Sequence, residues 1–203
     1  MKKCLFGGAL FAAGIGASIA SAQEFSFSYS FALASVGDIV DMDPYVSDQF
    51  TGAGFFSIAA AYGSSSATAS ASATEMRGTS ILNDGPGLFA GAGSFFAYFT
   101  VSTDTMVTVS WDFSGDSLGP NVIPSVIFLQ NLSNNDVLLD ETAETMVIGS
   151  VDIALEAGEE YFAQALAVAG DLDVGTSFYS IVIPAPPAGV LALAGLAAAR
   201  RRR

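Results

Sequence analysis

The chain has 203 residues, of which 20 are acidic and 7 are basic, and its formal net charge is −13 at pH 7. This charge excludes nucleic acids and anionic membranes as partners held by simple electrostatic attraction. The absence of histidine, together with a single cysteine, excludes the usual zinc sites and the hydrolases that need a histidine base.

The first residues have the layout of a secretory signal peptide. Lys2 and Lys3 form a positive start, residues 5–17 form an apolar segment rich in alanine and glycine, and small residues follow. We therefore predict that residues 1–22 direct the chain to the Sec translocon and are removed by signal peptidase. The residues of the predicted cleavage site are Ala20, Ala22 and Gln23.

The predicted exported domain, residues 23–183, is much more acidic than the whole chain. It contains all twenty acidic residues and one basic residue, Arg77, so its formal charge is −19. Such a domain repels nucleic acids, and also acidic polysaccharides unless divalent cations bridge them. Because Cys4 is lost with the signal peptide, the exported domain has no disulfide and must be stable through packing, or with a bound metal.

The beginning of the domain favours β-structure. Residues 25–33 (FSFSYSFAL) alternate strictly, which predicts a half-buried strand with Phe25, Phe27, Tyr29, Phe31 and Leu33 on one face. We expect an acidic loop over residues 37–49 and a strand over 55–62. Residues 63–73 (GSSSATASASA) fit either a flat edge strand or a mobile linker.

The rest of the domain shows short apolar runs separated by turn residues. Residues 83–87 (NDGPG) predict a turn, and residues 94–101 and 106–113 predict a hairpin. Further strands are expected over 125–130, 137–139, 146–155, 161–168 and 177–183. This pattern predicts an all-β fold, an antiparallel β-sandwich of jelly-roll type, flanked by an N-terminal signal helix and a C-terminal hydrophobic helix. Residues 155–161 (LEAGEEY) resemble a late hairpin of sandwiches similar to carbohydrate-binding modules.

The acidic and nucleophilic residues give little reason to expect an enzyme. Residues 115–118 (GDSL) resemble the nucleophile block of GDSL esterases, but Ser117 has no histidine to take its proton, so we interpret the match as a turn. A glycosidase needs only two carboxylates, for which Glu159 with Glu160, or Asp171 with Asp173, could be nominated. We expect no catalytic activity and keep the glycosidase as a distant alternative.

Calcium is the one metal ion for which the sequence offers suitable protein ligands. Two acidic loops carry the oxygen ligands that calcium prefers, although neither has the EF-hand pattern. The candidate residues are Asp38, Asp41, Asp43, Asp171 and Asp173.

One pair of aromatic residues is a candidate ligand patch. In residues 94–101 both faces are apolar, which fits either a covered central strand or an exposed patch of Phe96 and Tyr98. Trp111 alternates in phase with Val107, Val109 and Phe113, so we predict that it lies in the core.

The last twenty residues form three parts in series. A proline block (Pro184, Ala185, Pro186) precedes the uncharged run of residues 188–199 and four terminal arginines, Arg200, Arg201, Arg202 and Arg203. As a helix the apolar run would be about 18 Å long, against about 30 Å for the hydrocarbon core of a membrane. Extension toward the N-terminus meets prolines, which break helices, while the arginines favour a cytoplasmic end.

This layout resembles the PEP-CTERM sorting signal of bacterial exosortase substrates, with Ala185 where the family usually has glutamate. The resemblance covers residues 184–203 and implies transient retention in the inner membrane, processing by an exosortase-type enzyme, and transfer to the cell surface or extracellular matrix. An ordinary C-terminal transmembrane helix is the alternative. We therefore expect a structural or adhesive surface protein that contacts exopolysaccharide, or alternatively a surface protein similar to a carbohydrate-binding module.

Overall fold

The computed structural model describes residues 23–38, 45–83, 89–115, 124–144, 147–170 and 175–185. These residues form β-strands and connections, with no helix among them, as the sequence predicts. The strands are β1 (Phe25–Asp38), β2 (Tyr45–Gly52), β3 (Phe56–Tyr62), β4 (Ser65–Ala71), β5 (Glu75–Leu82), β6 (Phe89–Val101), β7 (Thr105–Asp112), β8 (Val126–Asn131), β9 (Asp136–Thr142), β10 (Ile148–Leu155), β11 (Tyr161–Gly170) and β12 (Gly175–Val182).

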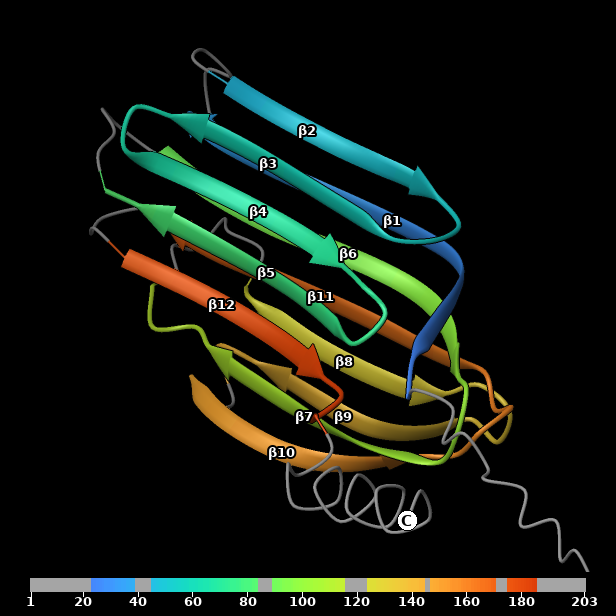
Figure 1. Cartoon of the computed structure of the whole chain (residues 1–203). Helices are drawn as coiled ribbons and strands as arrows, with labels where there is room; N and C mark the ends of the chain where they lie inside the picture. The colour runs from blue at the N-terminus through green and yellow to red at the C-terminus, as the bar shows by residue number, and fades with distance from the viewer. Residues whose placement is uncertain are drawn as a thin grey trace, which may run out of the picture.

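The strands form two antiparallel sheets that pack face to face (Figure 1). Sheet A has the order β2-β1-β6-β11-β8-β9, and sheet B has the order β10-β7-β12-β5-β4-β3. The antiparallel β-sandwich is therefore confirmed. From β5 onward the chain changes sheet at every connection except the hairpin between β8 and β9.

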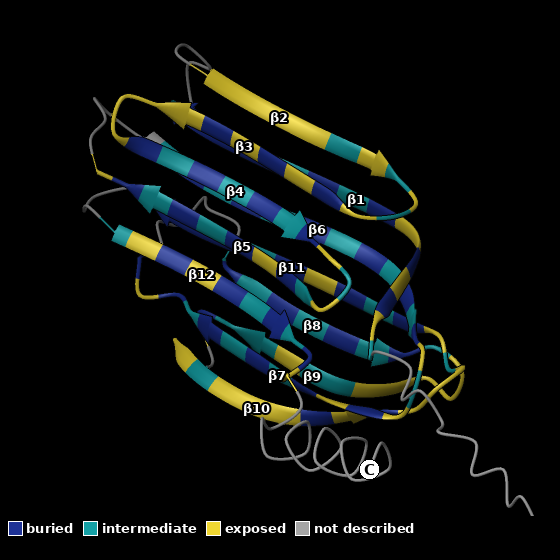
Figure 2. Ribbon diagram, viewed as in Figure 1, coloured by how far each residue is buried: buried dark blue, intermediate teal, exposed yellow. Residues whose placement is uncertain are grey.

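The core lies between the two sheets and consists of inward-facing side chains that alternate with outward ones along most strands, whereas the edge strands β2 and β9 contain no buried residue (Figure 2). Trp111 is 3% exposed and lies on the inner face of β7 with Val107 and Val109, which confirms its predicted core position. On β6, Phe95 and Phe99 are likewise buried. This strand lies between β1 and β11, as expected for a strand that is apolar on both faces.

A β-bulge in β1 reverses the predicted faces of that strand. Phe27 pairs with Phe99 and Tyr29 pairs with Tyr98, so Ser28 is an extra residue without a partner of its own. Phe25 and Phe27 are buried, as predicted, but Tyr29 and the residues in phase with it point outward. The prediction that all five large residues share one face is therefore wrong beyond Ser28.

The predicted hairpin of residues 94–101 and 106–113 is also wrong, because its two strands lie in different sheets. β6 belongs to sheet A and β7 to sheet B. The three-residue connection between them passes from one sheet to the other at the end of the sandwich. β10 and β11 are separated in the same way, so residues 155–161 connect the sheets and do not close a hairpin.

Three further strands differ from the sequence prediction. Residues 45–52 of the expected acidic loop form the edge strand β2. β4 is neither an edge strand nor a linker, because it pairs with β3 on one side and with β5 on the other. β5 was not predicted, since its sequence EMRGTSIL alternates between large and small residues without a clear apolar face.

The sheets come close together where β6 crosses β4 and β5. A Cβ atom added to Gly93 would lie 2.3 Å from the carbonyl oxygen of Thr68 and 2.9 Å from that of Thr79. Small side chains surround this crossing, among them the fully buried Ala34 and Ala69. At position 93 only glycine leaves room for the two backbones, so the sandwich is thin here.

Both ends of the domain are attached to one turn. The amide of Phe25 donates to the carbonyl of Ala73 at 2.7 Å, and the amide of Ile183 donates to the carbonyl of Thr74 at 2.9 Å. The chain therefore enters and leaves the sandwich at the same end. Residues 1–22 and 186–203 lie outside the described residues, and within the described part no helix is long and apolar enough to span a membrane.

Candidate functional site

Six aromatic side chains lie together on the outer surface of sheet A, and we call this group the aromatic face. They come from the four adjacent strands β1, β6, β11 and β8. Tyr29 is 39% exposed and the other five are half-buried, whereas their chain neighbours on β6 point into the core. The members are Tyr29, Phe31, Phe96, Tyr98, Phe128 and Phe162.

The rings of the aromatic face form one continuous set of contacts. Phe96 stacks on Phe31 with centroids 5.4 Å apart, and Tyr98 lies 5.1 Å from Phe162. Phe162 also joins Phe96 at 6.3 Å and Phe128 at 6.2 Å, while Tyr29 lies 6.0 Å from Phe96. These are the distances of attractive aromatic pairs, so the rings support one another and form a firm surface.

The strand register arranges the aromatic face and its neighbours in three rows. One row contains Tyr29, Tyr98, Phe162 and Gln130; the next contains Phe31, Phe96, Gln164 and Phe128; and the third contains Leu33, Ser94, Leu166 and Val126. No residue of these rows is charged. The exposed Gln164 lies directly between Phe96 and Phe128 in its row. The nearest acidic neighbour in this row is Asp140 on β9, opposite Phe128.

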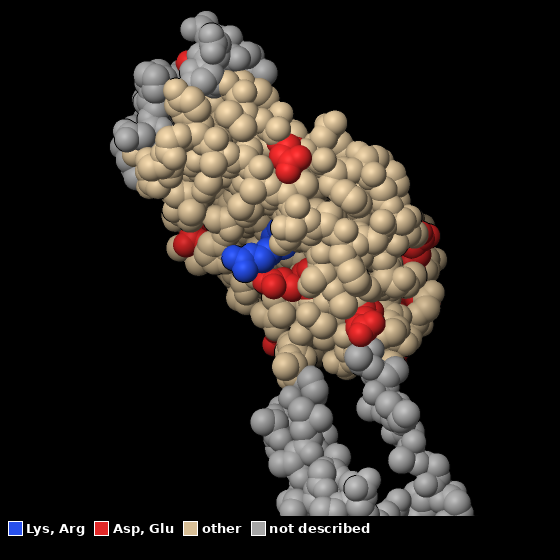
Figure 3. All heavy atoms as spheres, turned by 45° about the horizontal axis from the view of Figure 1, so that its top comes forward, with Lys and Arg blue, Asp and Glu red and all other residues tan. Residues whose placement is uncertain are grey.

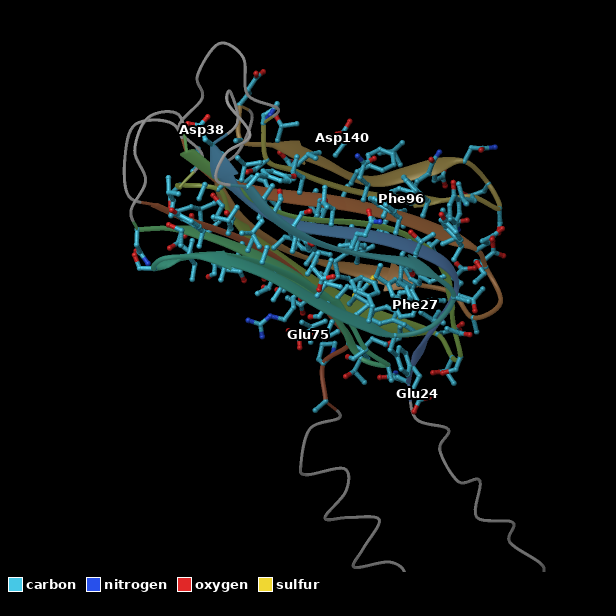
Figure 4. The ribbon with its side chains drawn as sticks, turned by 90° about the horizontal axis from the view of Figure 1, so that it is seen from above. Glu24, Phe27, Asp38, Glu75, Phe96 and Asp140 are labelled. Carbon is cyan, nitrogen blue, oxygen red and sulfur yellow. The ribbon has the colours of Figure 1, made fainter. Side chains whose placement is uncertain are left out.

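The structure places the predicted patch of Phe96 and Tyr98 at the centre of a larger surface. Figure 4 shows Phe96 on the outer side of sheet A, Phe27 between the sheets and Glu75 on the side of sheet B. Tyr29 and Phe31 were missed because the bulge at Ser28 reverses their direction. Phe128 and Phe162 alternate with buried residues in their own strands, and this alternation is the signal that could have placed them outside.

The outer surface of sheet B has a different character. Its middle row contains Ser57, Ser70, Arg77, Ser180, Ser110 and Ser150. The hydroxyls of Ser110 and Ser150 are 2.9 Å apart, and Arg77 lies 3.9 Å from Glu75. Figure 3 shows this cation beside a carboxylate, with further acidic groups spread over the rest of the visible face. Phe178, 37% exposed, is the only aromatic side chain in the shallow hollow around Arg77 apart from the buried Tyr179.

A polar hollow lies at the end of the sandwich where β10 leads into β11. It has a volume of about 350 Å³ and is lined by residues that include Asn131, Glu156, Glu159 and Tyr161. The Tyr161 hydroxyl accepts a hydrogen bond from the Glu156 amide at 2.7 Å. Burial raises the pKa of Tyr161 above its ordinary value of 10.0, and the carboxylates of Glu156 and Glu159 raise it further.

The carboxylates nominated for glycoside hydrolysis are not brought together as a described pair. Glu159 lines the polar hollow, while the neighbouring Glu160 is exposed and its amide donates to Ser133 Oγ at 3.2 Å. Asp171 and Asp173 lie outside the described residues.

For the calcium candidates, the structure describes Asp38 alone. It ends β1 opposite Phe89 of β6, while Gly170 of β11 pairs with Ala90, so the two acidic connections leave sheet A at the same edge, from the strands on either side of β6. Asp41, Asp43, Asp171 and Asp173 lie outside the described residues. Among the residues that are described, no group of three or more acidic or cysteine side chains could hold a metal ion.

The GDSL-like block is described only at its first residue. Gly115 is buried, its amide donates to the carbonyl of Thr176, and its carbonyl accepts from the amide of Gly170. A Cβ atom at this position would lie 2.4 Å from the Thr176 nitrogen. Glycine is therefore needed here for close packing of two backbones, while residues 116–118 lie outside the described part.

Neither a protein-family model nor a curated protein sequence matches the chain.

Proposed function

We propose that this chain is an exported bacterial protein of the cell surface or extracellular matrix, with a structural or adhesive, non-catalytic role. Its C-terminal residues 184–203 act as a temporary membrane tail that an exosortase-type enzyme removes. The observation that carries the proposal is the attachment of both domain ends to one turn, through Phe25 to Ala73 and Ile183 to Thr74.

This attachment supports a pathway in which the signal peptide directs export and the C-terminal tail then holds the folded domain at the same membrane. A domain that follows a signal peptide and is then retained by a C-terminal tail has both ends at the same membrane. Since both ends leave the sandwich together, the whole domain can stand on the outer side without unfolding either terminal strand. The aromatic face extends over the middle of sheet A and stays accessible in that position.

Processing of the tail is tested by intact-mass analysis of protein extracted from the cell surface of its natural host. We expect a mass that lacks residues 1–22 and at least residues 189–203. Replacement of Arg200–Arg203 by serine should reduce retention in the inner membrane, because the positive charges anchor the cytoplasmic end. Surface protein with an intact tail would overturn the sorting proposal and favour a permanent anchor.

Carbohydrate binding is the second candidate function, and the aromatic face is the observation that favours it. We also infer that the sandwich is of jelly-roll type. The inference rests on strands β5–β12, which give β5-β12-β7-β10 in one sheet and β6-β11-β8-β9 in the other, two interlocked Greek keys. β1 and β2 extend one sheet of this unit, and β3 and β4 extend the other.

A further inference from the structure

We propose that the aromatic face binds an uncharged glycan chain, with Gln164 as the hydrogen-bonding residue at its centre. This inference rests on the proposed function and names the ligand class of the surface that the function uses.

The charge of the aromatic face selects an uncharged partner. The three rows that hold the aromatic face and its neighbours contain no acidic or basic side chain, although the predicted exported domain carries a formal charge of −19. A polyanion would be repelled by the domain as a whole. A cationic partner would find its counter-charges elsewhere, for example at Asp104, Glu156 and Glu159 at the end of the sandwich.

The aromatic face by itself is small for the interface of a stable protein complex. Four strands about 4.8 Å apart span about 14 Å, and three rows about 6.7 Å apart span about 13 Å. The resulting area of roughly 200 Å² is about a quarter of the roughly 800 Å² that each partner buries in a stable protein complex. A surface of this size fits a short run of sugar rings, whose apolar faces pack on aromatic side chains.

The polar groups of the aromatic face fit a ligand that carries many hydroxyls. Gln164 is exposed and has Phe96, Phe128 and Phe162 as its register and strand neighbours. Its amide can both donate and accept, which a sugar hydroxyl requires. The phenol hydroxyls of Tyr29 and Tyr98 lie in the adjacent row. Sites for small polar ligands have this composition, mostly aromatic with a few placed polar groups.

The substitution Gln164→Leu distinguishes a glycan from an apolar partner, because it should weaken the binding of a glycan and strengthen the binding of an apolar surface. Leucine keeps the approximate size of glutamine and removes the hydrogen-bonding amide. If the face binds a glycan, affinity should fall about tenfold or more, since the hydroxyl at this position loses its partner. If the face binds an apolar surface, such as a second copy of the chain, association should become tighter.

The experiment measures the affinity of the full chain for uncharged and anionic polysaccharides by native affinity electrophoresis and pull-down. The probes are cellulose, mixed-linkage β-glucan, dextran and galactomannan, with alginate as the anionic comparison. The variants are Gln164→Leu, Phe162→Ala and, as a matched control on the other face, Phe178→Ala. Thermal unfolding of each variant verifies that the sandwich is intact.

We expect binding to at least one uncharged probe that falls about tenfold or more in Gln164→Leu and Phe162→Ala and is unchanged in Phe178→Ala. Absence of binding to all four uncharged probes, preference for alginate, or equal loss in Phe178→Ala would overturn the inference. So would concentration-dependent dimers that Gln164→Leu strengthens. A surface-located, tail-processed protein without glycan binding would refute this inference alone, whereas an unexported protein would refute the proposed function.

Discussion

Deletion of Ser30 should lower the free energy of unfolding more than deletion of Ser28, although each removes one serine from β1. Ser28 is the extra residue of the bulge, so its deletion leaves Phe27 opposite Phe99 and Tyr29 opposite Tyr98 in an unbroken ladder. Ser30 lies fully buried opposite Ala97. Its deletion forces at least Ser28 and Tyr29 to shift by one position.

The structure gives the size of each effect. Loss of Ser28 removes the hydrogen bond from its Oγ to the Tyr98 carbonyl at 3.2 Å, which costs about 1 kcal/mol. After loss of Ser30, one outcome moves the Tyr29 ring into the space of a buried serine, an overpacking that costs about 1–3 kcal/mol. The other outcome keeps the bulge and turns Phe25 and Phe27 outward, which costs roughly 1.5–3 kcal/mol for each ring.

The assay is equilibrium denaturation followed by the fluorescence of the single tryptophan. For a domain of this size, 1 kcal/mol corresponds to a change in Tm of about 2–4 °C. Two controls remove only the side chains: Ser28→Ala should match the Ser28 deletion, and Ser30→Ala should be neutral or stabilising, because Ser30 Oγ is buried without a hydrogen-bond partner. Equal losses for the two deletions would show that the bulge does not absorb the extra residue.

Three other substitutions test the packing of buried and closely packed positions. Gly93→Ala should destabilise the domain by about 1–3 kcal/mol, because the new Cβ meets the carbonyl of Thr68; unchanged chemical denaturation would contradict the close approach. Gly149→Ala should shift the emission of Trp111 to longer wavelength, because the added Cβ would lie 2.2 Å from the Trp111 ring; an unaltered spectrum would show that the ring does not lie over Gly149. Tyr179→Phe should stabilise the domain by about 1 kcal/mol or more, because the Tyr179 hydroxyl is buried without a hydrogen-bond partner. Burial also raises the pKa of Tyr179 well above its ordinary value of 10.0, so the unfolded chain loses this proton first, and stability should fall by about 1.4 kcal/mol per pH unit above pH 10; a Tyr179→Phe variant with the same alkaline loss would refute this account.

The sequence was sufficient for the fold class because alternation of side chains directly reports half-buried strands. The buried Trp111 and the two faces of β6 follow from the same period of two residues. Pairing partners could not be read in this way, since residues 102–104 are as short as a hairpin loop and yet connect different sheets. The candidate site was found in part: Phe96 and Tyr98 stand out in their own strand, whereas the four other rings are brought to them by register alone.

The bulge in β1 connects the thin core to the aromatic face. Before Ser28, the inward positions of β1 hold phenylalanines that pack on Phe99, with the Phe25 centroid 5.3 Å from the Phe99 centroid. Beyond it, β1 runs beside the part of β6 where Gly93 approaches Thr68, and its inner face holds the small residues Ser30, Ala32 and Ala34 before the larger Val36. A regular strand would point Phe31 into this space, which has no room for a ring. The single extra residue therefore keeps the sheets close together, and it also brings Phe31 beside Phe96 on the surface where we propose that a glycan binds.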